Sequence, residues 1–361
     1  MNITKTSTMN AYMRGRHLIA GALVALVTLG CTGTTASSTT ASSSETNVKK
    51  PSGSIIVYSG RKDSLVEPIF EQFTKDTGIR VEVRYGDSGA LAAQMLTEGS
   101  ASPADVFFAQ DAGALGALSK ARLLASLPSK TLSLVPKEYR AANATWVGVS
   151  GRVRVLVYNP NLVANPPKTI DALLSSEWNG KLGYAPANAS WQSFVTGLRI
   201  LRGEVKAEKW LRGFAANEPK AYASNGAVRD AVNAGQISIG LVNHYYIWER
   251  ISVVGEANFV ARNQYLTAGD PGGLLNVAGV AILKSSDNKL AAGAFVDYLL
   301  GKTAQTYFAQ KTFEYPLVAG VPTSVKIPKL TSLKPPKIDL SDLDTIAATQ
   351  ELLVKVKLLT R

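Results

Sequence analysis

The sequence predicts an α/β protein of two lobes, with two crossing hinge strands between the lobes and a ligand cleft. Short β-branched runs alternate with helical patterns, which favours a mainly parallel sheet covered on both faces. Two extended apolar runs, 146–158 and 274–283, are long enough to leave one lobe and enter the other. The composition of the 361 residues, 46% hydrophobic and 18% charged, is globular, and this length favours two medium-sized lobes.

The N-terminal segment has the pattern of an export signal. Residues 1–17 are polar and basic, and the apolar run 18–30 is too short to span a bilayer comfortably but suits a secretory core. Cys31, the one cysteine, follows a glycine and resembles a bacterial lipoprotein processing site. We expect a signal peptide over 1–30 and a lipidated flexible tether over 31–52. The alternative is an ordinary signal peptide cleaved nearby, and both alternatives predict export.

Three strands and the helices between them are expected in the first part of lobe 1, residues 53–149. The strands have a β-branched or alternating pattern, and the first helix is expected to stop at Gly78, since glycine favours the left-handed backbone of a helix C-cap. The predicted strands are 54–58, 79–85 and 105–108.

A second series of strands and helices is expected in lobe 2, residues 150–276. Its strands are 181–184 and 237–242, and its helices run over 191–201 and from about 247. The chain then returns to lobe 1 over 277–361, with a helix at 290–300 and C-terminal helices that pack on that lobe.

The ends of the strands locate the predicted cleft, because ligands of open α/β sheets lie outside the carboxyl ends of their strands. Tyr245 and Tyr246 follow one such end. At a strand-to-helix turn two adjacent tyrosines can converge on one point, although an isolated pair is more often one packed and one exposed residue at a helix start. A phenol, with a pKa of about 10, becomes a metal ligand only for a highly charged cation such as ferric iron.

From residue 55 to about 353, the chain resembles the bacterial ferric-iron-binding proteins that deliver Fe³⁺ to ABC importers. The resemblance implies a type II periplasmic-binding-protein fold, ferric iron as cargo, an importer permease as partner and a location on the outer face of the cytoplasmic membrane or in the periplasm. The motifs that carry it are Val-Tyr-Ser-Gly at 57–60, Pro-Ala-Asp-Val-Phe-Phe at 103–108, Ser-Gly-Arg at 150–152, Val-Asn-His-Tyr-Tyr at 242–246, Gly-Asp-Pro-Gly at 269–272 and Glu-Tyr-Pro-Leu at 314–317.

The resemblance also implies site residues. The adjacent iron-binding tyrosines of the family fall on Tyr245 and Tyr246. Its contacts to a synergistic anion, such as carbonate, phosphate or citrate, fall on Asp111, on the turn Asn188-Ala189-Ser190, and on Asn225. Arg152 offers a fixed bidentate cation for the same anion, and a structural ion pair in the crossing strand is an equal alternative.

Three positions depart from the family pattern. By ungapped spacing, the family's histidine ligand falls on Lys62, its glutamate ligand on Gln110, and the third tyrosine of some members on Trp191. Anion and water then complete the iron shell, or another tyrosine such as Tyr265 moves in, or the cargo is a ferric chelate. His244 is expected to face the lobe interior as a neutral hydrogen-bonding residue.

Other classes of function explain fewer of these features. The main alternative is a binding protein for an oxyanion or a small organic solute without metal, which Lys62 and Gln110 would also suit. No enzymatic activity is expected, because no Cys-His pair, nucleophile-elbow sequence or Walker-type loop is present. The formal net charge of +12 is spread along the chain without a basic block, so no nucleic-acid partner is expected. We expect a monomer that touches the membrane only through its lipid anchor.

Overall fold

The structure, a computed structural model, describes residues 51–324 and 326–360. The predicted signal peptide, Cys31 and nearly all of the predicted tether lie outside these residues. The strands are β1 (Ser54–Ser59), β2 (Arg80–Tyr85), β3 (Val106–Ala109), β4 (Val147–Tyr158), β5 (Leu182–Tyr184), β6 (Lys220–Ala221), β7 (Ile239–Asn243), β8 (Arg262–Gln264), β9 (Leu275–Ile282) and β10 (Tyr315–Pro316). The helices are α1 (Asp63–Thr77), α2 (Ser88–Glu98), α3 (Ala112–Lys120), α4 (Ser129–Leu132), α5 (Ala189–Arg202), α6 (Glu204–Ala216), α7 (Asn225–Asn233), α8 (Tyr245–Val254), α9 (Lys289–Leu299), α10 (Lys302–Gln310), α11 (Leu330–Leu333) and α12 (Ile346–Lys355), and the 3₁₀ turn η7 (Leu340–Asp344) precedes the last of them.

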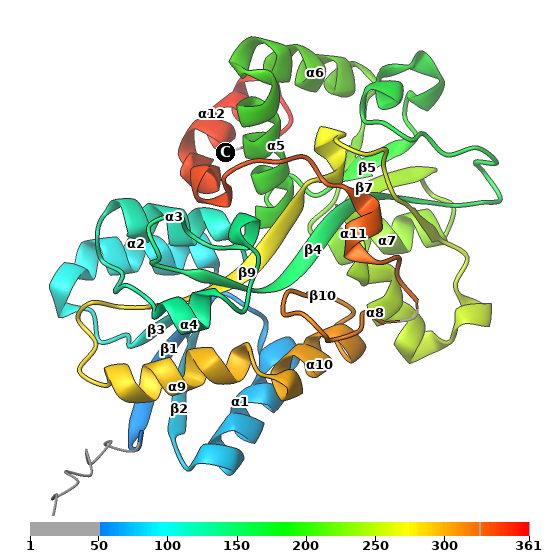
Figure 1. The fold of residues 1–361 in the computed structure, drawn as a ribbon. Coiled ribbons are helices and arrows are strands. Elements are labelled where there is room, and N and C mark those ends of the chain that lie inside the picture. Colours follow the sequence, from blue (N-terminus) through cyan, green and yellow to red (C-terminus); the bar gives the residue numbers. More distant parts are fainter. Residues whose placement is uncertain (1–50, 325, 361) are drawn as a thin grey trace, which may run out of the picture. The chain divides into compact units, whose positions relative to one another are not determined.

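The strands form one mixed sheet in the order β2-β1-β3-β9-β4-β7-β5-β6, with β8 and β10 paired to β4 (Figure 1). Strands β1, β2 and β3 are parallel, and so are β5, β6 and β7. The two central strands, β4 and β9, are antiparallel to each other and to their neighbours. The predicted parallel arrangement therefore holds within each half of the sheet, and the crossing strands make the whole sheet mixed.

Strand β4 carries the chain from one half of the sheet to the other. Its first part, Val147 to Val153, pairs with β9, and its second part, Arg154 to Tyr158, pairs with β7. Each of the two crossing strands contains a glycine near its middle, Gly151 in β4 and Gly279 in β9. A Cβ at Gly279 would lie 2.7 Å from Leu115 Cδ1, so close packing explains that glycine without a requirement for flexibility.

Each half of the sheet has its own hydrophobic core, and we call the halves the first and second lobes. In the first lobe Phe73 of α1 meets Phe295 of α9 edge to face, with ring centroids 5.1 Å apart. In the second lobe Trp210 of α6 stacks on Phe214 at 5.3 Å, and Trp191 of α5 packs beside them. The apolar faces of helices therefore contribute to both cores, including that of α6, which was not among the predicted helices.

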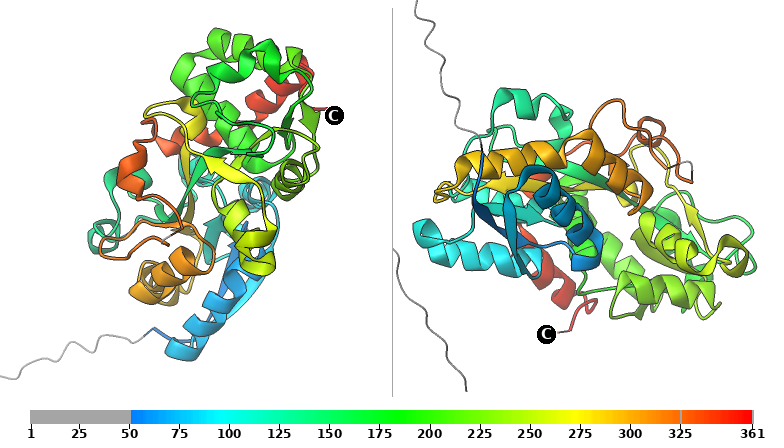
Figure 2. Two further views of the ribbon diagram at one scale, coloured as in Figure 1. Left: turned by 90° about the vertical axis from the view of Figure 1, so that its right-hand side faces the viewer. Right: turned by 90° about the horizontal axis from the view of Figure 1, so that it is seen from below.

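The expectation that all of residues 277–361 returns to the first lobe is wrong for the C-terminal helix. Leu352 and Leu353 of α12 are buried in the core of the second lobe, where α12 lies against α5 (Figures 1 and 2). Turn η7, just before it, packs its backbone on Gly113 and Gly116 of α3 in the first lobe. The amphipathic pattern of the C-terminal segment shows that it packs on a surface, but contacts distant in sequence decide which one.

Two helix ends in the first lobe follow local sequence signals. Gly78 ends α1 with a left-handed φ of 75°, as its position after the helical pattern predicts. Asp87 caps α2 by accepting hydrogen bonds from the backbone N–H groups of Gly89 and Ala90. No helix in residues 51–324 or 326–360 has the length and apolar character to cross a membrane.

Candidate functional site

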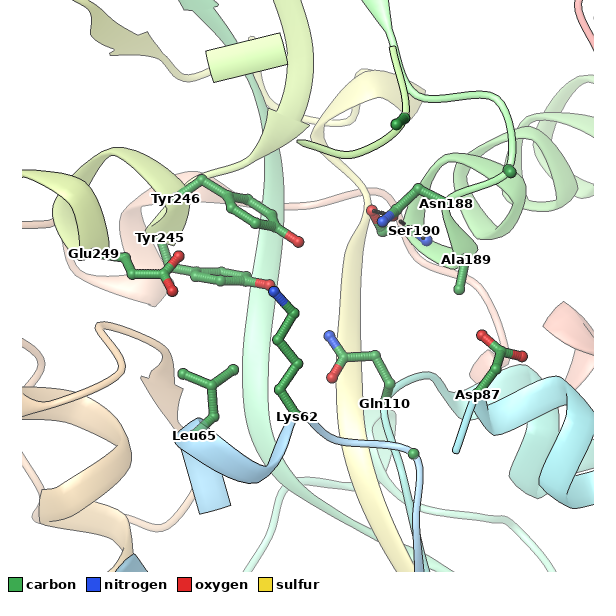
Figure 3. A pocket seen from close by; sticks show the side chains of 13 residues that line it. Lys62, Leu65, Asp87, Gln110, Asn188, Ala189, Ser190, Tyr245, Tyr246 and Glu249 are labelled. Atoms are coloured by element: carbon green, nitrogen blue, oxygen red, sulfur yellow. Dashed lines mark hydrogen bonds between the residues drawn. The ribbon is translucent and has the colours of Figure 1, made fainter. Parts of the chain in front are cut away.

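A cavity of about 280 Å³ lies where the carboxyl ends of strands from both lobes meet. The turns after β1 and β3 line it from the first lobe. The turn after β5 and the start of α8 line it from the second lobe (Figure 3). The lining residues are Gly60, Lys62, Leu65, Asp87, Gln110, Ala187, Asn188, Ala189, Ser190, Ala223, Tyr245, Tyr246 and Glu249. Strand ends thus meet at a cavity, as the predicted cleft requires.

Tyr245 and Tyr246 occupy one wall of this cavity. They form the first turn of α8, directly after β7, where successive side chains are about 100° apart instead of pointing to opposite faces. Their rings stack with centroids 4.3 Å apart and an interplanar angle of 25°. Both hydroxyl groups point to the same side, into the cavity (Figure 3). The structure therefore places the two phenols as a convergent pair.

The environment of the Tyr245 phenol favours its protonated form. Its side chain is buried, and burial together with the neighbouring Tyr246 raises its pKa well above the ordinary value. Tyr246 is only half-buried, and the guanidinium of Arg229 donates a hydrogen bond of 3.0 Å to its carbonyl oxygen, which fixes this turn. A cation would have to displace the proton of Tyr245 before that oxygen could become a ligand, which a highly charged metal does most readily.

The opposite wall carries a cation and an amide. Lys62 is exposed at the end of the β1–α1 turn, and its ammonium group points toward the hydroxyl of Tyr245 (Figure 3). Gln110 projects into the cavity, and its Oε1 accepts a hydrogen bond of 2.8 Å from Arg61. Arg61 is itself buried in a bidentate pair with Glu314, at 2.7 and 3.0 Å. The oxygen of Gln110 is thus already engaged, and this wall offers positive charge to a ligand.

The turn at the start of α5 forms a third side of the cavity. The Oδ1 of Asn188 accepts from the backbone N–H of Ser190 at 3.0 Å and from its hydroxyl at 2.7 Å. The Nδ2 of Asn225, from α7, donates to both Asn188 Oδ1 and Ser190 Oγ. Asn225 is fully buried, so it holds the turn from behind. The positive end of the α5 dipole therefore faces the cavity on a fixed turn, which suits an anion.

A second buried cation, Arg154, lies under this turn. Its guanidinium donates to the carbonyl oxygen of Ser190 at 3.0 Å and to that of Leu241 at 2.9 Å. Burial lowers its pKa to about 9, and no carboxylate in the described residues forms an ion pair with it. Sequence analysis did not select Arg154. The sequence signal that could have identified it is an arginine within the apolar, β-branched run of β4. Such a charge is buried, and a buried charge needs a compensating partner, which can be a ligand.

Asp111 and Arg152 belong to a buried network next to the cavity. The Oδ1 of Asp111 accepts from Asn276 at 2.8 Å and from Arg152 at 3.3 Å. Arg152 also donates to the carbonyl oxygen of Gln110, and its Nε lies 3.7 Å from Glu314. Neither Asp111 nor Arg152 lines the cavity beside the tyrosines. These contacts favour the structural ion-pair alternative for Arg152, while a contact of Asp111 with an anion stays a prediction.

Three further candidates lie away from the cavity. Trp191, at the position of a third tyrosine, is fully buried against Tyr184, with ring centroids 4.9 Å apart. Tyr265 is not part of the cavity lining. Both ring nitrogens of His244 are engaged by the backbone, with Nδ1 accepting from Val153 and Nε2 donating to Phe313, and burial lowers its pKa to about 4. His244 therefore has the neutral interior role expected for it.

The cavity combines oxygen donors with charges of both signs: its charged lining residues are Lys62, Asp87 and Glu249, and Arg154 is buried beneath the turn at Ser190. Within residues 51–324 and 326–360, no cluster of three His, Cys, Asp or Glu side chains could hold a metal ion. The hard oxygen donors that line the cavity include the two phenols and the carboxylates of Asp87 and Glu249. Two phenol oxygens leave most of the six positions of a ferric ion to other ligands, and the cations around the cavity suit an anionic one.

Comparison with known proteins agrees with this geometry. The family model described as bacterial extracellular solute-binding protein matches residues 58–306. An Fe(3+)-binding periplasmic protein of Serratia marcescens is 35% identical over 294 residues, which cover 81% of this chain and 87% of that protein. A major ferric iron-binding protein of Neisseria meningitidis is 34% identical over 291 residues, covering 79% and 87%.

Solved structures give the same result. Iron-bound HitA from Pseudomonas aeruginosa has a TM-score of 0.79 at 33% identity, and the match covers 84% of this chain and 99% of that one. A FutA of Trichodesmium in complex with iron and citrate has a TM-score of 0.74 at 31% identity, with 84% and 99% covered. The chain belongs to the bacterial extracellular solute-binding proteins, in the branch that contains these ferric-iron-binding periplasmic proteins.

Proposed function

We propose that this protein captures ferric iron outside the cytoplasm and delivers it to an ABC importer, with Tyr245 and Tyr246 as phenolate ligands. The observation that carries the proposal is the stacked tyrosine pair, whose hydroxyls point into one cavity at the meeting of the two lobes. The names of the relatives, which bind ferric iron, support the same cargo. The protein acts as a binding protein without enzymatic activity.

An anion or a small chelator completes the iron shell in this proposal. The start of α5 and Lys62 line the cavity and Arg154 is buried beneath the turn at Ser190, which favours carbonate, phosphate or citrate beside the metal. The citrate bound with iron in the Trichodesmium relative is an example of such a ligand. Asn188, Ala189 and Ser190 would contact the anion directly, and Asn225 would hold their turn.

The location and the partners of the protein follow from the same proposal. Export through the signal over 1–30 and a lipid on Cys31 would hold the protein at the membrane surface, where an importer permease receives the cargo. We propose that the protein works there as a monomer. Mass spectrometry of the mature protein tests the anchor, because a diacylglyceryl group on Cys31 adds a defined mass and ordinary cleavage does not.

The second candidate function is binding of an oxyanion or a small organic solute without metal. The observation that favours it is the first-lobe wall of the cavity. Lys62 stands at the position of the family's histidine ligand and presents an ammonium group, and the side-chain oxygen of Gln110 already accepts a hydrogen bond from Arg61. In that case the tyrosines would donate hydrogen bonds to the solute as neutral phenols. Metal content and colour separate the two candidates.

The test is a ferric titration of the purified protein followed by visible absorption. Phenolate bound to ferric iron gives a charge-transfer band that a strong chelator removes. We expect this band in the parent and not in the Tyr245→Phe/Tyr246→Phe double variant. The affinity of the double variant for ferric iron should fall by more than the roughly 100-fold that is lost when a residue supporting a metal ligand is removed. Tyr222→Phe, outside the cavity lining, is the matched control. An unchanged band and affinity in the double variant would refute the tyrosine assignment.

A further inference from the structure

A second cavity, of about 950 Å³, adjoins the tyrosine cavity. The two share three lining residues, Asp87, Ala187 and Ala189. The second cavity extends from there between α2 and α3 on one side and α5 and α12 on the other. Helix α12, which packs on the second lobe, provides one wall of this cavity. The cavity therefore exists because the C-terminal helix packs there.

The lining of the second cavity combines small apolar side chains with carboxylates. Helices α2 and α3 contribute alanines, among them Ala93, Ala114 and Ala117. The charged residues that line it are Asp87, Asp111, Asp344 and Glu351. No described lining residue is a lysine, an arginine or a histidine. Its charge is therefore opposite in sign to that of the cations beside the tyrosines.

The carboxylates differ in how they are paired. Asp344 accepts an ion pair from Lys120 at 2.9 Å, whereas Glu351 on α12 is exposed and has no ion pair within the described part of the chain. Asp111 is buried with one paired oxygen, and its Oδ2 has no hydrogen-bond partner among the described residues. A ligand with a hydrogen-bond donor or a positive charge would compensate these groups.

We propose that the cargo is a ferric chelate whose organic part extends from the iron into the second cavity, as a short aliphatic chain that ends in an amine. This inference rests on the proposed function and specifies its substrate class. Iron would lie between the phenols and the chelator, whose acidic groups would face Lys62 and the start of α5. The chain would pass over the alanines, and its ammonium would lie near Glu351 and Asp87. A volume of 950 Å³ is within the range of small-molecule binding sites.

Three ferric complexes of one core test the proposal. Nitrilotriacetate occupies four of the six positions of ferric iron and leaves two for the tyrosines. Its lysine-derived analogue, Nα,Nα-bis(carboxymethyl)-L-lysine, adds a four-carbon chain with an amine, and N-acetylation of that amine removes the charge. We expect the amine complex to bind about fivefold tighter than ferric nitrilotriacetate, since a tethered ammonium gains up to two weak ion pairs. The acetylated complex should lose most of this gain.

Two variants assign the gain to the second cavity. Glu351→Gln removes an exposed carboxylate of α12, and Ala114→Leu narrows the space beside α3. Both should bind ferric nitrilotriacetate as the parent does and bind the amine complex less well than the parent. Equal affinity of the parent for all three complexes, or an equal gain in both variants, would overturn the proposal while the iron function stands. Failure of the parent to bind any of the complexes would overturn both.

Discussion

The two walls of the tyrosine cavity differ in chemistry. The second-lobe wall, at the start of α8, presents two hard oxygen donors whose rings stack at 4.3 Å. The first-lobe wall presents an ammonium group at Lys62 and the amide of Gln110, whose oxygen is held by Arg61. If iron binds as proposed, the tyrosines of the second-lobe wall select the metal, and Lys62 of the first-lobe wall favours a negatively charged second ligand on the iron. Under the proposed function, this difference between the walls means that the protein and an anionic ligand would share the iron shell.

The largest effect that we expect concerns the tyrosine wall and pH. Because the pKa of Tyr245 is raised well above its ordinary value, this phenol carries its proton near neutrality and must release it to bind iron. The apparent affinity should therefore rise with pH, by about tenfold per pH unit for each proton released. The measurement is the number of protons released per iron in weakly buffered solution. Tyr245→Phe is the control, and the same proton release in that variant would contradict the role of Tyr245.

A change of intermediate size is expected at the first-lobe wall. Lys62→His replaces an ammonium group by a neutral metal ligand, so iron affinity in anion-depleted buffer should rise by roughly tenfold. Lys62→Met removes the charge without adding a ligand and should give a smaller gain. Titrations of both variants with and without citrate measure the two effects. Equal gains would mean that position 62 acts through charge alone and does not reach the iron.

The smallest change in iron affinity is expected from substitution of the two buried arginines of β4. One of them is expected to affect iron binding and the other the stability of the fold. Arg154→Gln should weaken anion-dependent iron binding a few-fold, because it removes the cation beneath the turn at Ser190. Arg152→Gln should instead lower the free energy of unfolding by about 3 kcal/mol, since it leaves Asp111 and Glu314 short of a buried partner. Chemical denaturation and iron titration of both variants separate the roles. If Arg152→Gln abolishes the anion dependence at full stability, Arg152 is an anion ligand after all.

Features that depend on neighbouring residues could be predicted from the sequence. The strand that begins at residue 54 and the glycine stop at Gly78 come from local patterns and lie where these patterns predict them. The prediction that Tyr245 and Tyr246 can converge is of the same kind, because the change from strand to helix geometry between β7 and α8 is encoded within a few residues.

The sequence by itself therefore determined the α/β alternation and the two-lobed architecture, and it placed two adjacent tyrosines at a strand end without deciding whether they converge. Only the tertiary structure decided that α12 packs in the second lobe, that Arg154 is buried without an ion pair, and that a second cavity adjoins the first. The physical reason is the sequence separation of the contacts involved. Local propensities fix backbone geometry over a few residues, whereas burial and charge pairing depend on groups that the fold brings together from distant parts of the chain, such as Arg61 and Glu314, which are 253 residues apart.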